Sequence, residues 1–360
     1  MESKLVAKFS GHNYLRQRLV MATLAGRALR VDQIRAQADS PGLVDYEISF
    51  LRLLEKVTNG SVIEIGYTGT SFLYRPGLLA GGKVFHDCPT SRAVGYFLEA
   101  MVALAPFCKK PLNLRLTGIT SDNVDMSVDT IRTVSLVQLT SFGIPEDVEL
   151  KIVKRGSAPQ GGGEVHFSCP VVHTLTPVLL VDEGRIKRIR GIVHATRVSP
   201  EMPNRVVTAA RAYINRYIPD IYLYTDLFKG ADSGKSPGYG ASLVAETTTG
   251  ARLCAELCAQ PGQTPEEVGA LVAKQLLHEI QKGGYFDTNH QWLPLLLMTL
   301  CPEDVSKIRL GRLSEFTIQY LRDIREMFNT TFKIKPDPET KTVLLTCIGS
   351  GYSNVNKKRT

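Results

Sequence analysis

The chain has 360 residues, and its 43 Lys and Arg against 35 Asp and Glu give a formal net charge of +8. Hydrophobic residues make up 43 % and charged residues 22 %, which is typical of a globular protein and excludes a disordered, collagen-like or low-complexity chain. At ~150 residues per domain, the length suggests two domains, or one large domain with an insertion. The positive excess favours a polyanionic partner.

The hydrophobic pattern predicts alternating helices and strands in the first half of the chain. The expected helices cover residues 15–25, 43–58, 91–105 and 127–142, and the expected strands cover residues 29–34, 61–67, 112–116 and 148–154. Residues 61–70 (SVIEIGYTGT) and 111–120 (PLNLRLTGIT) both read as a strand followed by Thr-Gly, a polar loop and a helix. This similarity suggests a repeated unit of sheet and helices in an α/β (α+β) fold.

The composition changes near residue 184, where a strand carries Arg185, Lys187 and Arg190. The elements expected after it are a helix at 200–218, a strand at 220–225, a hairpin of 241–247 with 252–258, and a helix at 264–282. Thr264 and Glu267 fit the capping-box spacing at the start of that helix. We predict that residues 184–280 form an α/β insert domain, that residues 1–183 and 281–351 form the main body, and that residues 352–360 form a basic tail.

Neither a membrane segment nor a disulfide framework is predicted. The strongest apolar stretch, residues 293–300, is far shorter than the ~20 residues that cross a bilayer. The N-terminal residues lack the apolar core of a signal peptide. The seven cysteines are an odd number scattered through apolar runs, so we expect reduced core residues of an intracellular protein.

The sharpest local motif is residues 155–165, RGSAPQGGGEV, which lies between two expected strands. Three consecutive glycines are costly in backbone entropy, so either something approaches the backbone closely or φ is positive. The exposed amides of Gly161, Gly162 and Gly163, beside Arg155, are able to cradle a phosphate. A tight turn that allows close sheet packing explains the same residues equally well.

Three other motifs favour structural interpretations. Residues 230–236 resemble a nucleotide P-loop but have three residues, not four, between their glycines. Asp122, Asp125 and Asp129 suit the entry of a helix better than a metal site. His290 has no evident Ser or Cys partner that would make it a catalytic base. We therefore expect no metal and no cofactor.

Residues 314–328 predict an amphipathic helix. The residues expected to face inward are Ile318, Leu321, Ile324 and Phe328, and those expected to face outward are Arg322, Asp323, Arg325 and Glu326. Arg322 and Arg325 are able to bind an RNA phosphate or an acidic partner. A solvated face is the favoured alternative.

The run at 155–165 resembles the signature of the RNA 3′-terminal phosphate cyclase family, and further matches at 15–16, 34–36, 41–43 and 118–129 extend the resemblance from about residue 9 to 351. It implies the cyclase fold, a body of repeated βαβ-type units with a smaller α/β insert. The chain is most similar to the cyclase-like eukaryotic branch of the family. The stretches that carry this likeness are 225–226, 233–238, 244–248 and 295–300.

The departures from the cyclase pattern imply that cyclase activity is absent. Residues 9–14 (FSGHNY) stand where cyclases have an acidic, glycine-rich stretch, and Tyr46-Glu47 stand where they have Gln-His. Cyclases form a covalent adenylate on a late histidine, and aligning the final helix places Phe316 at that position. A phenyl ring is not a nucleophile, so the resemblance predicts a protein that is not a cyclase enzyme.

The resemblance implies a ribosome biogenesis factor of the small-subunit processome, in the nucleus and nucleolus, required for early pre-rRNA cleavages that lead to 18S rRNA. Its expected partners are a ribosome-assembly GTPase, a box C/D snoRNA particle and pre-rRNA, which it joins as a monomer in a heteromeric complex. The anion or RNA candidates are Arg16, Arg35, Arg155, Gly161, Gly162 and Gly163. The partner-binding candidates are Arg185, Lys187, Arg188, Arg190, Arg322 and Arg325.

Two alternatives stay open. In the first, proposed for this branch, the chain is an endonuclease that cleaves pre-rRNA, with Asp323 as base and Arg322 and Arg325 stabilising the phosphate. In the second, a residual pocket holds an anion or nucleotide at Gly161–Gly163 and Arg155 without turnover. Phe9 or Tyr14 filling that space would argue against such a pocket.

Overall fold

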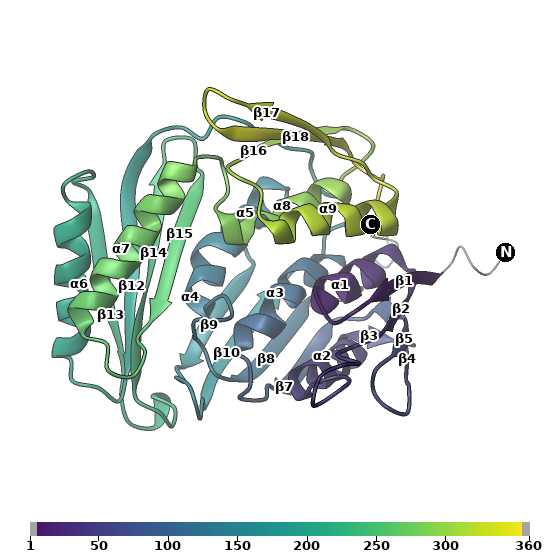
Figure 1. The fold of residues 1–360 in the computed structure, drawn as a ribbon, viewed down its shortest axis with the longest axis horizontal. Helices are drawn as coiled ribbons and strands as arrows, with labels where there is room; N and C mark the ends of the chain where they lie inside the picture. The colour runs from purple at the N-terminus through teal and green to yellow at the C-terminus, as the bar shows by residue number, and fades with distance from the viewer. Residues whose placement is uncertain (1–5, 355–360) are drawn as a thin grey trace.

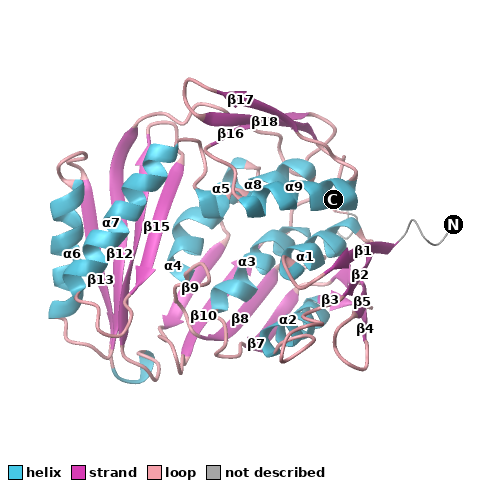
Figure 2. Cartoon of the chain, in the orientation of Figure 1, coloured by secondary structure: helices cyan, strands magenta, loops and turns pink. Residues whose placement is uncertain are grey.

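The computed structural model describes residues 6–354, and its main body consists of three units with one topology (Figures 1 and 2). In the first unit, β1 and β2 are parallel, and the antiparallel β5 and β4 extend the sheet in the order β1-β2-β5-β4. Its elements are β1 (Val6–Ser10), α1 (Leu15–Ala25), β2 (Ala28–Asp32), α2 (Asp45–Val57), β4 (Val62–Ile65) and β5 (Phe72–Arg75). The short strands β3 (Thr58–Asn59) and β6 (Leu78–Leu79) pair beside it.

The second unit repeats this arrangement in the order β7-β8-β10-β9. Its elements are β7 (Gly82–Asp87), α3 (Val94–Leu104), the 3₁₀ turn Ala105–Phe107, β8 (Leu112–Gly118), α4 (Val128–Thr130), α5 (Leu136–Ser141), β9 (Glu149–Lys154) and β10 (Gly163–Cys169). The helix expected at 127–142 is interrupted by one π-helical stretch, Ile131–Ser135. Ser127 caps α4 by accepting a hydrogen bond from the Thr130 amide.

The third unit has the order β11-β16-β18-β17 and was not predicted. Its elements are β11 (Leu179–Leu180), α8 (Trp292–Thr299), β16 (Val305–Leu310), α9 (Glu315–Phe328), β17 (Lys333–Asp337) and β18 (Thr342–Ile348). Repetition was therefore right, but the two similar segments were wrongly matched. Residues 61–70 include β4 and residues 111–120 include β8, strands that occupy different places in their units.

The insert lies in the chain between β11 and α8 and forms its own sheet, in the order β13-β12-β14-β15. Its elements are β12 (Ile186–Thr196), α6 (Glu201–Ile214), β13 (Ile221–Phe228), the 3₁₀ turn Gly230–Asp232, β14 (Gly238–Thr247), β15 (Arg252–Cys258) and α7 (Pro265–Lys282). Helices α6 and α7 cover one face of this sheet (Figure 1). The predicted capping box of Thr264 and Glu267 is confirmed at the start of α7.

Two hydrophobic cores support the two parts. In the body, α1, α3, α8 and α9 gather in the middle and the three sheets lie around them (Figure 1), with Leu19, Phe97 and Leu296 fully buried. The insert has a separate core between its sheet and its two helices, which includes Val193 and Val272. Each part thus buries an apolar face of its own, and polar contacts carry much of the junction between them.

The first residues of the predicted basic tail, 352–354, pack on the body. The Tyr352 ring packs edge-on against Phe107 with centroids 5.2 Å apart, and the buried Asn354 side chain donates to the Cys108 and Val172 carbonyls. The basic run Lys357-Lys358-Arg359 lies outside the described residues. All seven cysteines are free, as expected, and in the described chain no helix has the length and apolar character of a membrane span.

Candidate anion and RNA site

The position predicted to replace the adenylated histidine lies at the start of α9. Ser314 caps this helix by accepting a hydrogen bond from the Thr317 amide, which places Phe316 in its first turn. The Phe316 ring stacks on Tyr320 with centroids 5.6 Å apart and contacts the Tyr14 ring at 5.2 Å. Phe316 is therefore part of an aromatic wall that joins α9 to the N-terminus of α1, and its phenyl ring is not a nucleophile.

Three arginines line a hollow of about 260 Å³ beside this wall: Arg16, Arg35 and Arg92. Arg16 forms an ion pair with Glu99 at 2.5 Å, and Arg35 donates to both carboxylate oxygens of Glu47 at 2.8 Å. The hollow thus brings together the two predicted candidates Arg16 and Arg35.

Arg92 is a third cation of this hollow that sequence reasoning missed. It donates to both oxygens of Asp125, at 2.8 and 2.5 Å, and its guanidinium lies 4.6 Å from the Tyr96 ring centroid. Burial lowers the pKa of Arg92, but the hydrogen bonds to Asp125 and the charge of Asp125, with smaller contributions from Tyr96 and Tyr46, together outweigh it and the pKa is raised overall. Arg92 therefore stays charged. Each of the three arginines can donate to a phosphate while it also keeps its bond to a carboxylate.

A second hollow of about 510 Å³ adjoins the first and lies between the body and the insert. Arg16, Arg92, Trp292 and Phe316 contribute from the body, and Glu256 is among the insert residues that line it. Burial raises the pKa of Glu256, although hydrogen bonds from Ser127 and Thr130 oppose the rise. Both signs of charge line this second hollow, and its positive charge comes from Arg16 and Arg92, which it shares with the first hollow.

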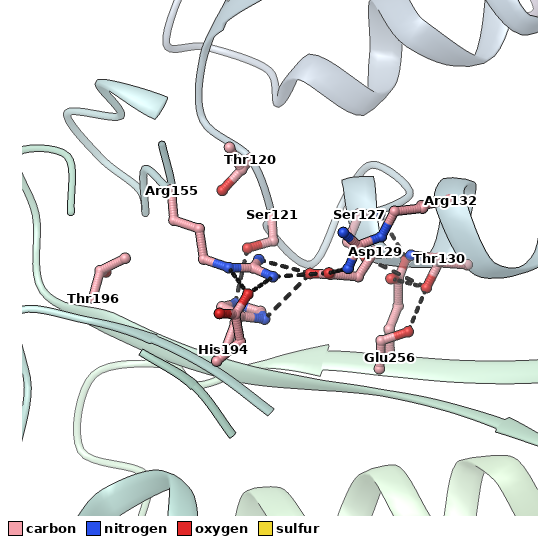
Figure 3. Close-up of polar contacts among 12 residues, drawn as sticks. Thr120, Ser121, Ser127, Asp129, Thr130, Arg132, Arg155, His194, Thr196 and Glu256 are labelled. Carbon is pink, nitrogen blue, oxygen red and sulfur yellow. Dashed lines mark hydrogen bonds and ion pairs between the residues drawn. The ribbon is translucent and has the colours of Figure 1, made fainter. Parts of the chain in front are cut away.

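Arg155 lines neither hollow; its side chain is fully buried and points toward Asp129 (Figure 3). Its guanidinium donates to both oxygens of Asp129, at 2.7 and 2.8 Å, and to Asp226 from Nε at 2.9 Å and from Nη2 at 2.7 Å. Asp129 belongs to α4 of the body and Asp226 to β13 of the insert. Arg155 is therefore a buried link between the two parts, and the expectation that it faces an incoming phosphate is corrected.

His194 extends the same network. Its Nε2 lies 2.9 Å from Ser121 Oγ, and its Nδ1 lies 3.9 Å from Asp129 (Figure 3). Burial, and next the positive charge of Arg155, lower the pKa of His194 to about 4. The ring is therefore neutral at neutral pH, while Asp129 keeps its charge because Arg155 more than offsets the cost of burial.

The three consecutive glycines serve close packing. A Cβ at Gly161 would lie 2.9 Å from the Gly118 carbonyl carbon, and one at Gly163 would lie 2.5 Å from Thr120 Cγ2. The insert loop that resembles a P-loop packs on the same glycines, since the Lys235 amide donates to the Gly161 carbonyl at 3.0 Å. Of the two interpretations of this motif, the structure favours the turn that permits close approach.

The proposed nuclease residues do not converge on one point. Asp323 is buried and accepts hydrogen bonds from Arg18 Nε at 2.8 Å and from Gln319 at 2.8 Å, whereas Arg322 and Arg325 are exposed. The outward orientation predicted for Asp323 is wrong, because the residue pairs with Arg18 of α1 across the helix interface. Ile318, expected inside, is exposed as well.

His290 does have the neighbours that sequence reasoning did not find. Its Nε2 lies 3.0 Å from Ser135 Oγ, and its Nδ1 lies 2.9 Å from Asp287 and 3.8 Å from Cys254 Sγ. All four side chains are buried, and burial raises the pKa of the Cys254 thiol well above its usual value. The group offers no accessible nucleophile, and its three potential metal ligands, Cys254, Asp287 and His290, fall short of the four of a structural zinc site.

The basic strand predicted as a docking edge is central in its sheet. Arg188 and Arg190 belong to β12, which lies between β13 and β14. Arg188 Nε donates to Glu246 at 2.6 Å, and Arg190 Nη1 donates to Asp220 at 2.9 Å. The edge strands are β13 and β15, so any contact made by these arginines involves the face of the sheet and not its border.

A sequence model of the family described as RNA 3′-terminal phosphate cyclase matches residues 7–334. The chain belongs to the RNA 3′-terminal phosphate cyclase family. It is 54 % identical over 361 residues to the human RNA 3′-terminal phosphate cyclase-like protein, with 97 % of each chain covered. It is 49 % identical over 362 residues to the rRNA processing protein rcl1 of Schizosaccharomyces pombe, with 99 % of each chain covered. It is also 49 % identical to the probable RNA 3′-terminal phosphate cyclase-like protein of Dictyostelium discoideum, with 97 % of this chain and 98 % of the relative covered.

The family membership and the mixed α/β fold predicted from the sequence are thus confirmed. The cyclase-like names of these relatives set them apart, by name, from the cyclases of the same family. The aromatic wall of Tyr14, Phe316 and Tyr320 brings together two of the departures noted in the sequence. Tyr14, in the stretch predicted to replace the glycine-rich segment of cyclases, packs against the residue predicted to replace their histidine.

Proposed function

We propose that this family member acts in rRNA processing as a binding factor and not as a cyclase. The observation that carries this proposal is the 49 % identity, over 99 % of both chains, to a protein named for rRNA processing. The site supports it, because Phe316, the residue predicted to replace the adenylated histidine, lies in an aromatic wall, and His290 is buried. A phenyl ring offers no atom on which a covalent adenylate can form.

The finer assignment is part of the same proposal. The chain acts in the small-subunit processome, in the nucleus and nucleolus, and is needed for the early pre-rRNA cleavages that lead to 18S rRNA. It binds a ribosome-assembly GTPase and works beside a box C/D snoRNA particle. The exposed Arg322 and Arg325 of α9, together with Arg185 and Lys187, are the side chains that we assign to partner contacts.

Within this function, the hollow of Arg16, Arg35 and Arg92 binds a phosphate group of RNA. Its three guanidinium groups come from α1, from the loop after β2 and from the loop before α3, and two of them stack on the Tyr96 ring. Arginine suits this role because it offers several donors in a fixed plane while it keeps its bond to a carboxylate. The loss of the catalytic residue leaves such a binding site intact.

The function is tested by depleting the protein in eukaryotic cells that depend on it and supplying variants. We expect the early pre-rRNA precursors to accumulate and 18S rRNA to fall on depletion, and the wild-type chain to restore both. Northern blots of pre-rRNA measure this. Normal levels of 18S rRNA and of its precursors after complete depletion would contradict the proposed function.

A labelling experiment tests the absence of cyclase chemistry. We expect the pure protein, incubated with Mg²⁺ and ATP labelled in its α-phosphate, to carry no label after denaturing electrophoresis, because Phe316 cannot attack phosphorus. A catalytically active member of the family, treated in the same way, is the positive control. A stable adduct on this chain would overturn the assignment as a non-cyclase.

The endonuclease alternative predicts a different outcome for Asp323→Asn. Because Asp323 pairs with Arg18 in the interior, we expect the substitution to lower the free energy of unfolding by about 3 kcal/mol, since it leaves a buried guanidinium without its counterion. Urea unfolding measures the change, and Glu326→Gln, on the exposed side of α9, is the matched control with an expected change below ~0.5 kcal/mol. Loss of site-specific RNA cleavage with unchanged stability would favour the nuclease instead.

A further inference from the structure

One corner of the insert sheet faces the body but is not covered by it. Strand alternation places Leu223 of β13 under α6 and α7, so its neighbours Tyr222 and Tyr224 point to the opposite face. The body packs on part of this face through Arg155 to Asp226 and Ser121 to His194. The part that stays open, together with Arg132 of the body beside it, is the uncovered corner, which we define as Arg188, Arg190, Tyr222 and Tyr224 of the insert and Arg132 of the body.

The two tyrosines are the most unusual feature of the uncovered corner. Tyr222 is 59 % exposed and Tyr224 is 42 % exposed, although both belong to a regular strand. Their ring centroids are 6.4 Å apart with planes tilted by 34°. A pair of neighbouring aromatic rings open to solvent is typical of a surface that binds something flat and apolar.

Arginines lie beside both rings. Arg190 is paired in register with Tyr222, and Arg132 is close enough to Tyr224 that its charge acts on the phenol. Arg188 follows on the same face of β12, two residues before Arg190. The uncovered corner thus combines two π faces with three guanidinium groups.

The carboxylates around the uncovered corner do not neutralise these charges fully. Glu246 is shared between Arg188 and Arg252, at 2.6 and 3.6 Å. Asp220 pairs with Arg190, and its pKa is lowered first by hydrogen bonds from Arg190 and further by the charges of Arg188 and Lys187. The local field is therefore positive, which favours an anionic ligand.

The acidic side chains deeper in this network also form ion pairs with arginines. Asp129 and Asp226 are held by Arg155, and Arg132 adds a second cation beside Asp129. An approaching phosphate would meet guanidinium groups before any free carboxylate of this network. None of the five residues that define the uncovered corner is aliphatic. A protein partner would be expected to bury a less charged and more apolar surface.

We propose that the uncovered corner binds single-stranded RNA, with bases stacked on Tyr222 and Tyr224 and phosphates held by Arg132, Arg188 and Arg190. This inference rests on the proposed role in rRNA processing and adds a second RNA contact to it, separate from the hollow beside Phe316. Aromatic platforms combined with cations suit single strands, because every base has a π face, whereas a duplex hides its bases. Strand β13 is the open edge of its sheet, at the end of the molecule away from both termini (Figure 1), so a strand of RNA has free access to it.

Binding of a fluorescein-labelled 12-nucleotide oligouridine, followed by fluorescence anisotropy at fixed salt, tests the stacking. We expect the double variant Tyr222→Ala/Tyr224→Ala to raise the Kd at least about tenfold, because two stacking faces are removed. The double variant with Phe at both positions keeps the rings and should stay within about twofold of the wild type. Tyr217→Ala removes an exposed tyrosine outside the uncovered corner and should change nothing.

The contribution of the cations has an independent test. Arg190→Ala should raise the Kd about threefold or more and reduce the slope of log Kd against log salt concentration by about one unit. Arg205→Ala is the matched control, because Arg205 is also an exposed arginine paired with one carboxylate, Glu266, but lies on α6. Equal effects of the two substitutions would overturn the assignment of Arg190.

The outcomes separate this inference from the proposed function. Unchanged oligouridine binding by the double alanine variant overturns the RNA surface, even if depletion still blocks rRNA maturation. If that variant binds RNA normally but no longer retains its protein partners from the processome, the uncovered corner is a protein interface and the inference is wrong. If the double alanine variant loses only RNA binding, and A-form duplex RNA competes poorly for the wild-type protein, the inference is supported. That support would hold even if depletion of the chain left rRNA maturation unchanged.

Discussion

Replacing Arg155 with Ala is expected to lower the free energy of unfolding by about 4 kcal/mol. The substitution removes a fully buried guanidinium, so that Asp129 keeps only its 3.3 Å ion pair with Arg132 and Asp226 loses both hydrogen bonds from Arg155. Breaking a buried ion pair from one side is among the most costly single changes, because the fully buried Asp129 carboxylate loses its main counterion without gaining water. Urea unfolding followed by circular dichroism measures the loss.

The same variant should also loosen the junction between body and insert. The chain has one tryptophan, Trp292, and it lines the hollow between the two parts. We expect the fluorescence of Trp292 to change at lower urea than the circular dichroism in Arg155→Ala, since the junction opens before the two cores unfold. Arg205→Ala, which removes a half-exposed ion pair on the insert surface, should cost below ~1 kcal/mol. A change of less than about 1 kcal/mol in Arg155→Ala would show that the junction does not depend on this residue.

Gly156→Ala is expected to lower the free energy of unfolding by about 3 kcal/mol, or to prevent accumulation of soluble protein. A Cβ at this position would lie 2.3 Å from the Gly163 amide nitrogen and 2.7 Å from the Gly161 carbonyl carbon. Both are backbone atoms, so no flexible side chain can move aside and the strands β9 and β10 must separate. Thermal and urea unfolding measure the effect.

The control for this prediction is Gly230→Ala. Gly230 has a positive φ of 63° but open space where a Cβ would go, so its substitution should cost only the backbone strain of about 1 kcal/mol. If Gly156→Ala were as stable as the wild type but bound RNA less well, the glycine motif would be a ligand site and our interpretation of it as a packing device would be wrong.

Local sequence signals predicted the helices of the first two units, their strands β2, β4, β8 and β9, and the elements of the insert, whereas β1, β5 and β7 were not predicted. The helix at 15–25 coincides with α1, and the cap of α7 was found because Thr264 and Glu267 lie within one turn of each other. Such features depend on neighbours in the chain, so the sequence displays them directly. The third unit was missed because its first strand, β11, has two residues and is separated by the whole insert from the strand with which it pairs.

The site was harder to predict, because its residues meet only through the fold. Arg155 was singled out correctly as unusual, but its partners Asp129 and Asp226 are 26 and 71 positions away in the chain. Nothing near Arg92 in the sequence indicates that it joins Arg16 and Arg35. By contrast, the alternation of Tyr222 and Tyr224 with buried Leu223 is a local pattern, and it could have indicated an exposed aromatic face.

The division of the third unit has a consequence for how the chain matures on the ribosome. Val178, just before β11, pairs with Ser306, which is synthesised 128 residues later. The insert can complete its own hydrophobic core before β16, the strand that pairs with β11, has been synthesised. The third sheet can form completely only after β18 has left the ribosome. Long-range closure of this kind is slow and leaves strand edges exposed. We therefore expect nascent chains truncated before residue 348 to engage chaperones, with release coinciding with completion of the C-terminal sheet.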